Sequence, residues 1–267
     1  MKIVDSSIEL LKQEGWDIKG IYQQIEKCAR ICYLSLDKMT DNSWQEFTKR
    51  MIGSGHFATL EHGSVYMKTT QSQLFDFYKS DPYSKVYVEQ INGETIYYIT
   101  TNYRVIEENK RWHDLTYCCE PTDYHHKRIC IKFILPISIS REFCRHRKFS
   151  FCEQSTRYVN FSKEFRGKEI TFIKPYWYNE ETSEEFKNNC QQAEDTYMHL
   201  TIKNNLKAQE AREFLPLCTK TELVMTGFVQ DWNHFISLRA HHAAHPDAQK
   251  LAVLVKELLI EGGYING

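Results

Sequence analysis

Residues 145–158 read RHRKFSFCEQSTRY and concentrate more anion-binding groups than any other window of the chain. Within fourteen residues they place three arginines, a lysine, an imidazole, a carboxylate and three serine or threonine hydroxyls. Such a segment would make a poor core, and the planar donor fork of arginine suits phosphate and carboxylate oxygens. The stretch therefore predicts a site that holds a phosphorylated ligand.

The residues before this stretch predict a rigid support for it. Residues 128–135 are rich in β-branched and aromatic side chains, so we expect a strand that Pro136 stops. Ser138 or Ser140 is then expected to cap a helix that runs directly into Arg145. The anion-binding groups would thus begin on a strand-to-helix junction.

Local signals also predict elements on the N-terminal side. Apolar residues at helical spacing indicate an amphipathic helix over residues 17–33, and a second helix capped by Asn42 or Ser43 should end near Gly53. Residues 63–70 alternate as a strand, and residues 85–102 form two strand-like runs around Asn92-Gly93, a strong hairpin signal.

The C-terminal part is expected to be mostly helical. A long helix is predicted over residues 184–213, and Thr219-x-x-Glu222 matches a capping box that would open the next helix. Pro246 should start a final helix that Gly262-Gly263 ends. The economical prediction is one α+β domain over residues 1–267, with an antiparallel sheet flanked by helices.

Composition narrows the class of protein. The 34 Lys and Arg residues balance 35 Asp and Glu residues, which disfavours a general nucleic-acid coat. The chain contains no apolar run of about 18 residues and no signal-peptide pattern at its start, so we expect a cytoplasmic protein without a membrane partner. The nine cysteines lack C-x-x-C spacing and are expected to be reduced thiols.

Several short motifs together resemble one enzyme family. Arg145-His146-Arg147, followed after seven residues by Ser155, is similar to the signature of the flavin-dependent thymidylate synthases. Further segments similar to that family occur in the same order: Cys28-Ala29-Arg30, Gly55-His56 with Glu61-His62, Thr101-Asn102-Tyr103-Arg104, Ala211-Arg212 with Leu215-Pro216, and Leu238-Arg239.

The resemblance implies a reaction and an assembly. A methylene group would pass from methylenetetrahydrofolate to C5 of dUMP and be reduced to methyl by FAD, which NADPH recharges. The protein would be a homotetramer in which several subunits build each site. The anionic character of dUMP, FAD, NADPH and folate agrees with an arginine-rich site.

The resemblance also implies residue roles. It assigns flavin binding to His56, Arg145, His146, Arg147, Glu153, Gln230 and His234. It assigns nucleotide binding to Glu142, Arg145, Glu153, Gln154, Ser155, Thr156, Arg157, Arg212 and Arg239. Arg239 is the implied catalytic residue, because a fixed cation facing the uracil would favour ionisation at N3 and raise electron density at C5.

Departures from the family pattern keep a related activity open. Cys152 and Phe228 stand where family members often have Asn, and Glu142 stands where Gln is common. A carboxylate at Glu142 would repel an anionic nucleotide unless Arg141 or Arg145 neutralises it. A flavin enzyme that leaves hydroxymethyl at C5 of a deoxypyrimidine nucleotide therefore remains an alternative.

Other short motifs are compatible with other classes and roles. His113-Asp114 raises a metal-dependent nucleotide phosphohydrolase of the HD type, and the arginine-rich stretch alone would also suit a non-catalytic nucleotide or RNA binder. His241 and His245 have the spacing of a metal pair on a helix, but Pro246 favours a helix end or a subunit contact, and no metal is expected. Ser155 is expected to bind nucleotide, and Cys152 to pack, rather than act as nucleophiles.

Overall fold

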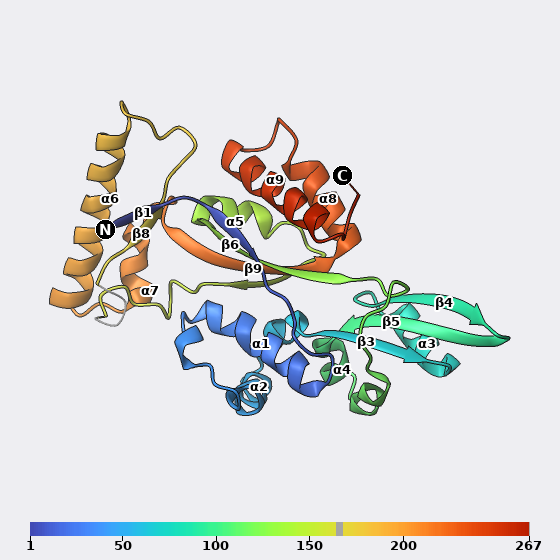
Figure 1. Cartoon of the computed structure of the whole chain (residues 1–267). Coiled ribbons are helices and arrows are strands. Elements are labelled where there is room, and N and C mark those ends of the chain that lie inside the picture. The colour runs from blue at the N-terminus through green and yellow to red at the C-terminus, as the bar shows by residue number, and fades with distance from the viewer. Residues whose placement is uncertain (164–167, 267) are drawn as a thin grey trace.

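The computed structural model describes residues 1–163 and 168–266, and Figure 1 labels its elements. In chain order they are β1 (Lys2–Val4), β2 (Ser7–Leu10), α1 (Ile18–Cys32), η1 (Leu36–Lys38), α2 (Ser43–Gly53), η2 (Phe57–His62), β3 (Ser64–Thr69), α3 (Ser72–Ser80), β4 (Lys85–Ile91), β5 (Glu94–Asn102), α4 (Tyr103–Glu108), η3 (Trp112–Tyr117), β6 (Arg128–Pro136), α5 (Ile137–Phe143), β7 (Ser150–Glu153), β8 (Thr171–Ile173), α6 (Ser183–Met198), η5 (His199–Lys203), α7 (Ala208–Ala211), η6 (Arg212–Phe214), β9 (Lys220–Phe228), α8 (Val229–Arg239) and α9 (Pro246–Glu261). No described helix is long and apolar enough to cross a lipid bilayer.

A four-stranded antiparallel sheet in the order β2-β6-β9-β7 forms the centre of the molecule. Its longest pairing joins β6 and β9, from Arg128 opposite Phe228 to Pro136 opposite Lys220. Side chains alternate along these strands: Phe133 and Met225 pack against α5, α8 and α9, whereas side chains of the other face pack on α1. Figure 1 shows α1 on the opposite side of this sheet from α8 and α9. The α+β class and the antiparallel sheet between helices are therefore confirmed.

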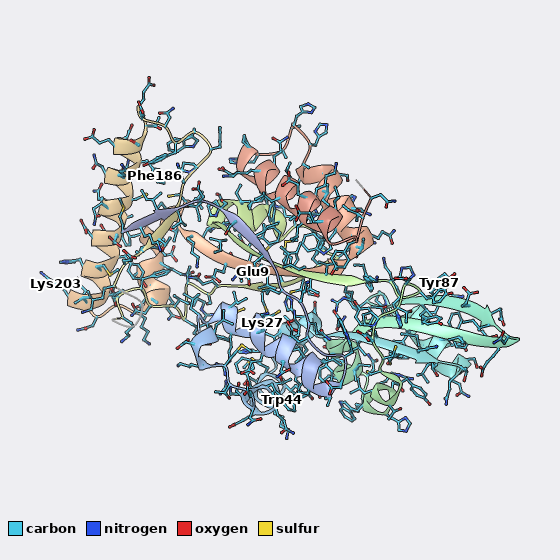
Figure 2. All side chains as sticks on the ribbon, viewed as in Figure 1. Glu9, Lys27, Trp44, Tyr87, Phe186 and Lys203 are labelled. Carbon is cyan, nitrogen blue, oxygen red and sulfur yellow. The ribbon has the colours of Figure 1, made fainter. Side chains whose placement is uncertain are left out.

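A second sheet, in the order β3-β5-β4, lies at one end of the molecule. Asn92 and Gly93 connect β4 and β5 with φ angles of 52° and 83°, as a two-residue hairpin turn requires. The hairpin predicted from this dipeptide is confirmed. Figure 2 shows Tyr87 on this hairpin and Phe186 on α6 at the opposite end of the molecule.

The helix predicted over residues 184–213 is wrong in its extent. Helix α6 ends at Met198, a π-helical turn follows, and Asn205 adopts the left-handed conformation with φ 56°. Asparagine tolerates this conformation because its short side chain bonds locally, so Asn204-Asn205 ends the helix where apolar spacing alone suggested that it continues. Chain direction then changes before the short helix α7 (Figure 1).

The capping box predicted at Thr219-x-x-Glu222 is also wrong, because Lys220–Phe228 is strand β9. Seven of its nine residues are buried, and it pairs with β6 on one side and β7 on the other. A strand buried on both faces lacks simple alternation, so a local helix-start motif outweighed the true signal. The helix that carries Gln230, His234 and Arg239 begins only at Val229.

The predicted caps of α5 need the same correction. The N-cap of α5 is Pro136, and Ser138 and Ser140 lie within the helix. The Ser140 hydroxyl instead donates to Glu153 Oε1 at 2.5 Å. This bond connects α5 to the end of β7 across the anion-binding stretch.

Gly227 is the position where the sheet leaves least room. A Cβ atom there would stand 2.6 Å from the ring of Phe149, whereas a Cβ at Gly53 would meet nothing within 4 Å.

We expect Gly227→Ala to lower the free energy of unfolding by about 1–3 kcal/mol, because overpacking must displace Phe149. Gly53→Ala in α2 should leave it unchanged or raise it by up to about 1 kcal/mol. Denaturant unfolding of both variants measures this, and equal effects would contradict the close packing.

Candidate functional site

The anion-binding stretch, residues 145–158, runs along the edge of the central sheet and does not continue helix α5. Helix α5 ends at Phe143, a turn follows, and residues 150–153 form β7 at the edge of the sheet, with Ser150 opposite Thr226 and Glu153 opposite Leu223. The predicted strand-to-helix junction thus lies just before the stretch. The two ends of β7 border two different cavities.

The first, which we call the arginine cavity, lies beyond the C-terminal end of β7 and encloses about 520 Å³. It brings together residues from α5, the loop after β7, η6 and the start of β9. Its lining consists of Ile137, Arg141, Glu153, Gln154, Ser155, Thr156, Arg157, Arg212, Glu213, Leu215, Leu217 and Thr221. The structure therefore gathers six residues that the sequence assigned to nucleotide binding, including Arg212, which is distant along the chain.

Charge in the arginine cavity favours an anionic ligand. Three guanidinium groups face two carboxylates, and within residues 1–163 and 168–266 no salt bridge engages Arg141 or Arg157. Arg212 lies 3.7 Å from Glu213 and donates to the Thr156 hydroxyl at 3.5 Å. Free guanidinium donors beside hydroxyl groups are suited to a phosphate.

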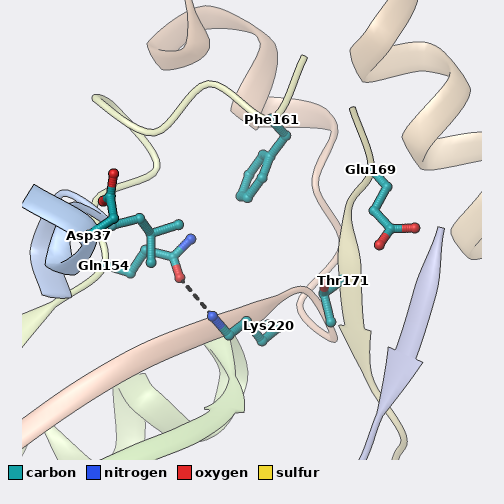
Figure 3. Close-up of a pocket in the computed structure, with 7 residues that line it drawn as sticks. Asp37, Gln154, Phe161, Glu169, Thr171 and Lys220 are labelled. Carbon is teal, nitrogen blue, oxygen red and sulfur yellow. Dashed lines mark hydrogen bonds between the residues drawn. The ribbon is translucent and has the colours of Figure 1, made fainter. Parts of the chain in front are cut away.

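A smaller cavity of about 400 Å³ shares Gln154 with the arginine cavity. Gln154 is buried, and its side-chain oxygen accepts from Lys220 Nζ at 3.3 Å (Figure 3). Lys220 also pairs with Glu222. Figure 3 shows Asp37, Phe161, Glu169 and Thr171 around the same space. The sequence could not place Lys220 here because the residues around it were expected to be helical.

The other cavity, which we call the phenylalanine cavity, lies at the N-terminal end of β7 and encloses about 550 Å³. It combines aromatic rings with cationic groups from three separate segments. Its lining consists of Ala58, Glu61, Pro82, Tyr83, Lys85, Asn102, Arg128, Arg147, Lys148, Phe149, Ser150, Phe151, Gly227, Phe228 and Asp231. Among the predicted flavin ligands it contains Arg147.

Lys85 connects this cavity to another predicted flavin ligand. Its ammonium group donates to Gln230 Oε1 at 2.8 Å and lies 4.5 Å from the centre of the Phe228 ring. Burial lowers the pKa of Lys85. Lys85 and Arg128 were missed as candidates because β4 and β6, which carry them, are distant along the chain from the end of β9. The sequence feature that could have indicated Lys85 is its position directly after residues 80–84, a segment rich in turn-forming residues.

A third group, the Glu142–Arg239 cluster, connects the end of α5 to the last turn of α8. Arg239 donates from Nη1 to Glu142 Oε2 at 2.7 Å, from Nη2 to the Glu142 carbonyl at 2.8 Å, and from Nε to His146 Nε2 at 3.0 Å. Arg239 therefore neutralises Glu142, where the sequence had suggested Arg141 or Arg145. The ring of His234 lies 6.5 Å from that of His146.

The predicted flavin ligands are not all brought together in one chain. His56 is exposed at the start of η2, with Nδ1 3.3 Å from the Tyr33 hydroxyl, and lines none of the cavities described above. Arg145 is exposed in the turn after α5, and His146 and His234 lie in the Glu142–Arg239 cluster. Glu153 belongs to the arginine cavity, so it lies with the nucleotide group.

The other motifs have structural roles. Asp114 accepts from the Tyr78 hydroxyl at 2.8 Å and from Arg111 Nε at 2.5 Å, which supports a structural role and disfavours the HD-type alternative. His245 caps α9 by accepting from the Asp247 amide, in agreement with the predicted helix end.

Cys152 is buried, and its hydrogen bond with Cys32 together with burial raises its pKa well above the ordinary value. A thiol in this state is a poor nucleophile, which agrees with a packing role.

Comparison with known proteins gives a consistent result. Residues 122–261 match the model of a family described as thymidylate synthase complementing protein. Proteins named flavin-dependent thymidylate synthase from Corynebacterium aurimucosum and Corynebacterium diphtheriae are 28% and 31% identical over 140 and 139 residues. These matches cover 46% of this chain in each case and 54% and 53% of the relatives, so the chain spans about half of their length. A protein of the same name from Mycolicibacterium vanbaalenii is 23% identical over 261 residues, covering 92% of this chain and 78% of the relative.

The imidazole of His146 should titrate at low pH. Burial, followed by the charge of Arg239 and the proximity of His234, lowers its pKa to about 4. We expect Arg239→Gln to move this pKa upward part of the way to the ordinary value of about 6.5, because burial remains when the cation is removed. NMR titration of the imidazole protons measures the shift, with Lys256→Gln on the exposed side of α9 as the control.

The same shift predicts a pH dependence of folding. The unfolded chain binds a proton at this histidine below about pH 6.5 whereas the folded protein does so only near pH 4, so stability should fall as pH drops through this window. His146→Gln should flatten that fall. A wild-type His146 pKa at or above 6.5 would contradict the geometry.

Proposed function

Because the chain belongs to the flavin-dependent thymidylate synthase family, the family of thymidylate synthase complementing proteins, we propose that it methylates dUMP to dTMP. Methylenetetrahydrofolate is the proposed carbon donor, and FAD reduced by NADPH is the proposed hydride source. In the overall reaction, the uracil C5 would lose its hydrogen as a proton and gain a bond to the methylene carbon. That carbon would separate from tetrahydrofolate and gain one hydride to become methyl.

The arginine cavity is the observation that carries the nucleotide part of this proposal. Arg141, Arg157 and Arg212 present guanidinium groups to one space. A nucleotide monophosphate offers them a compact dianion, and paired arginine–phosphate hydrogen bonds are among the stronger polar contacts. Ser155 and Thr156 add hydroxyl groups beside them. We assign the phosphate of dUMP to this cluster.

The phenylalanine cavity has the chemistry that FAD requires. Arg147, Lys148 and Lys85 are cations suited to a diphosphate, and the rings of Phe149 and Phe228 offer apolar surfaces to a planar ring system. The residues present therefore fit the cofactor. When bound, the flavin supplies the hydride, while these side chains would bind its diphosphate and exclude water.

The Glu142–Arg239 cluster leaves Arg239 able to contact a substrate. Arginine has five N–H donors, and three of them bond to Glu142 and His146, which leaves two for a ligand. Glu142 and His146 act as positioning residues, because they fix the plane of the guanidinium. We propose that these two donors face the uracil carbonyl region and stabilise negative charge on the base.

Assembly would complete the site. In one chain the arginine cavity, the phenylalanine cavity and the Glu142–Arg239 cluster are formed by distinct sets of residues, and His56 and Arg145 lie outside both cavities. A homotetramer in which several subunits contribute to each site would bring these groups to shared ligands.

A direct assay tests the reaction. The purified chain should be yellow and, with NADPH, methylenetetrahydrofolate and dUMP, should yield a product with the mass of dTMP. A product with the mass of hydroxymethyl-dUMP would instead establish the related activity left open by Glu142, Cys152 and Phe228. A protein that binds flavin but leaves dUMP unchanged under these conditions would overturn both.

Arg157 should contribute to nucleotide affinity. We expect Arg157→Gln to lower kcat/KM for dUMP roughly 10- to 100-fold, mostly through KM, because a charged hydrogen bond to phosphate contributes about 1.5–3 kcal/mol. Arg50→Gln on the exposed face of α2 is the matched control and should leave kcat/KM unchanged. Steady-state kinetics at fixed folate and NADPH measure both. A kcat loss at unchanged KM would place Arg157 away from the phosphate.

A further inference from the structure

Three buried side chains meet beneath the central sheet, on the face away from α8 and α9. Cys28 comes from α1, His62 from the end of η2 and Cys130 from β6, with exposed fractions of 0%, 1% and 6%. The two sulfur atoms and one ring nitrogen of His62 all lie within 4.8 Å of one another. Neither this trio nor any of its members lines the cavities described above.

The spacing of the two sulfurs matches a shared metal ion. Cys28 Sγ and Cys130 Sγ are 3.7 Å apart. Two thiolates on one tetrahedral zinc ion, each at about 2.3 Å, stand about 3.8 Å apart. The thiol pair would therefore need almost no movement to bind such an ion.

The orientation of His62 is the second, independent observation. Its Nδ1 lies 2.7 Å from the Thr226 hydroxyl, while its Nε2 is buried and has no hydrogen-bond partner among the described residues. If Nδ1 donates its proton to Thr226, Nε2 carries a lone pair and is available as a ligand. Metal-binding histidines are commonly held in this way by a partner on the other nitrogen.

An unsatisfied ring nitrogen in this layer is costly. A buried polar atom without a partner has lost its hydrogen bonds to water without replacement, and the surrounding layer is apolar, with Leu11, Ile31 and Val224.

The charge balance selects the ion. Zn²⁺ with two thiolates and a neutral imidazole has no net charge, whereas Cu⁺ with the same ligands leaves one negative charge in a buried layer. A buried net charge is expensive, so the neutral complex is favoured. Two cysteines and one histidine are also a ligand set used by zinc in proteins, with a fourth position left for water.

We propose that Cys28, His62 and Cys130 bind a zinc ion that fastens α1 and η2 to the central sheet. Binding forms two Zn–S bonds and one Zn–N bond, and the two thiol protons pass to solvent. Thr226 lies opposite Ser150, the first residue of β7, so the ion would stabilise the sheet directly behind the anion-binding stretch. This site is separate from the proposed reaction, which needs no metal.

The test uses the full chain, with bound flavin retained. Elemental analysis after purification without chelators should find one zinc per chain. Co²⁺ added after zinc removal should give tetrahedral d–d bands at wavelengths longer than flavin absorption. Cys28→Ser and Cys130→Ser should each abolish these bands and lower Tm. His62→Cys should still bind the metal but more weakly, because its third thiolate completes the ligand set and leaves one net negative charge in the buried layer.

The matched control is another thiol pair in the same chain. The sulfur atoms of Cys190 and Cys218 are 3.9 Å apart, but among the described residues no third metal-ligating side chain lies close enough to form a site with them. Cys190→Ser should therefore keep the zinc content and the cobalt spectrum of the wild type. If the serine variants unfold, the zinc content and the cobalt bands of the wild type and of His62→Cys still decide the proposal.

Several outcomes would overturn the proposal. Reduced wild-type protein that takes up neither Zn²⁺ nor Co²⁺ would do so, as would metal binding that survives in folded Cys28→Ser. A purified chain whose mass and peptide map show a Cys28–Cys130 disulfide, with no metal bound after reduction, would identify the pair as a redox couple instead. None of these results depends on thymidylate synthesis.

Discussion

The antiparallel pairing of β6 with β9 is the constraint on which the other parts of the structure depend. Its two ends set the positions of the arginine and phenylalanine cavities: Thr221 near the start of β9 lines the first, and Gly227 and Phe228 at its end line the second. Strand β7 pairs along the middle of β9 and spans from one to the other. Because a strand rises about 3.3 Å per residue, the four residues of β7 hold the cavities at a fixed separation of roughly 10 Å.

This arrangement explains why one short stretch borders two cavities. Arg147 and Lys148 precede β7 and line the phenylalanine cavity, whereas Ser155 and Arg157 follow it and line the arginine cavity. A helix of similar length would have placed these groups on several faces and closer together. An edge strand instead separates them, and its rigid pairing with β9 limits the entropy lost when ligands bind.

The sequence predicted the parts of the structure whose causes are local. The Asn92-Gly93 hairpin and the helix that starts at Pro246 depend on backbone preferences of single residues, and both were confirmed. The concentration of cationic and hydroxyl side chains in residues 145–158 is visible in the sequence because it depends only on residue type. Strand β9 was missed because its burial comes from β6 and β7, which are distant in sequence. Lys85 was missed as part of the phenylalanine cavity for the same reason.

The face of the central sheet that packs on α1 buries two kinds of polar group, thiols and an imidazole, whose burial has different free-energy costs. A thiol such as that of Cys152 is readily buried in an apolar layer, because the S–H group is a weak donor and its desolvation costs little free energy. An imidazole has one strong donor and one strong acceptor, and Thr226 satisfies only one nitrogen of His62. Burial of His62 in this layer therefore favours a ligand at its second ring nitrogen that replaces the lost hydrogen bond to water. Two thiols already at metal spacing are the groups that the fold provides there.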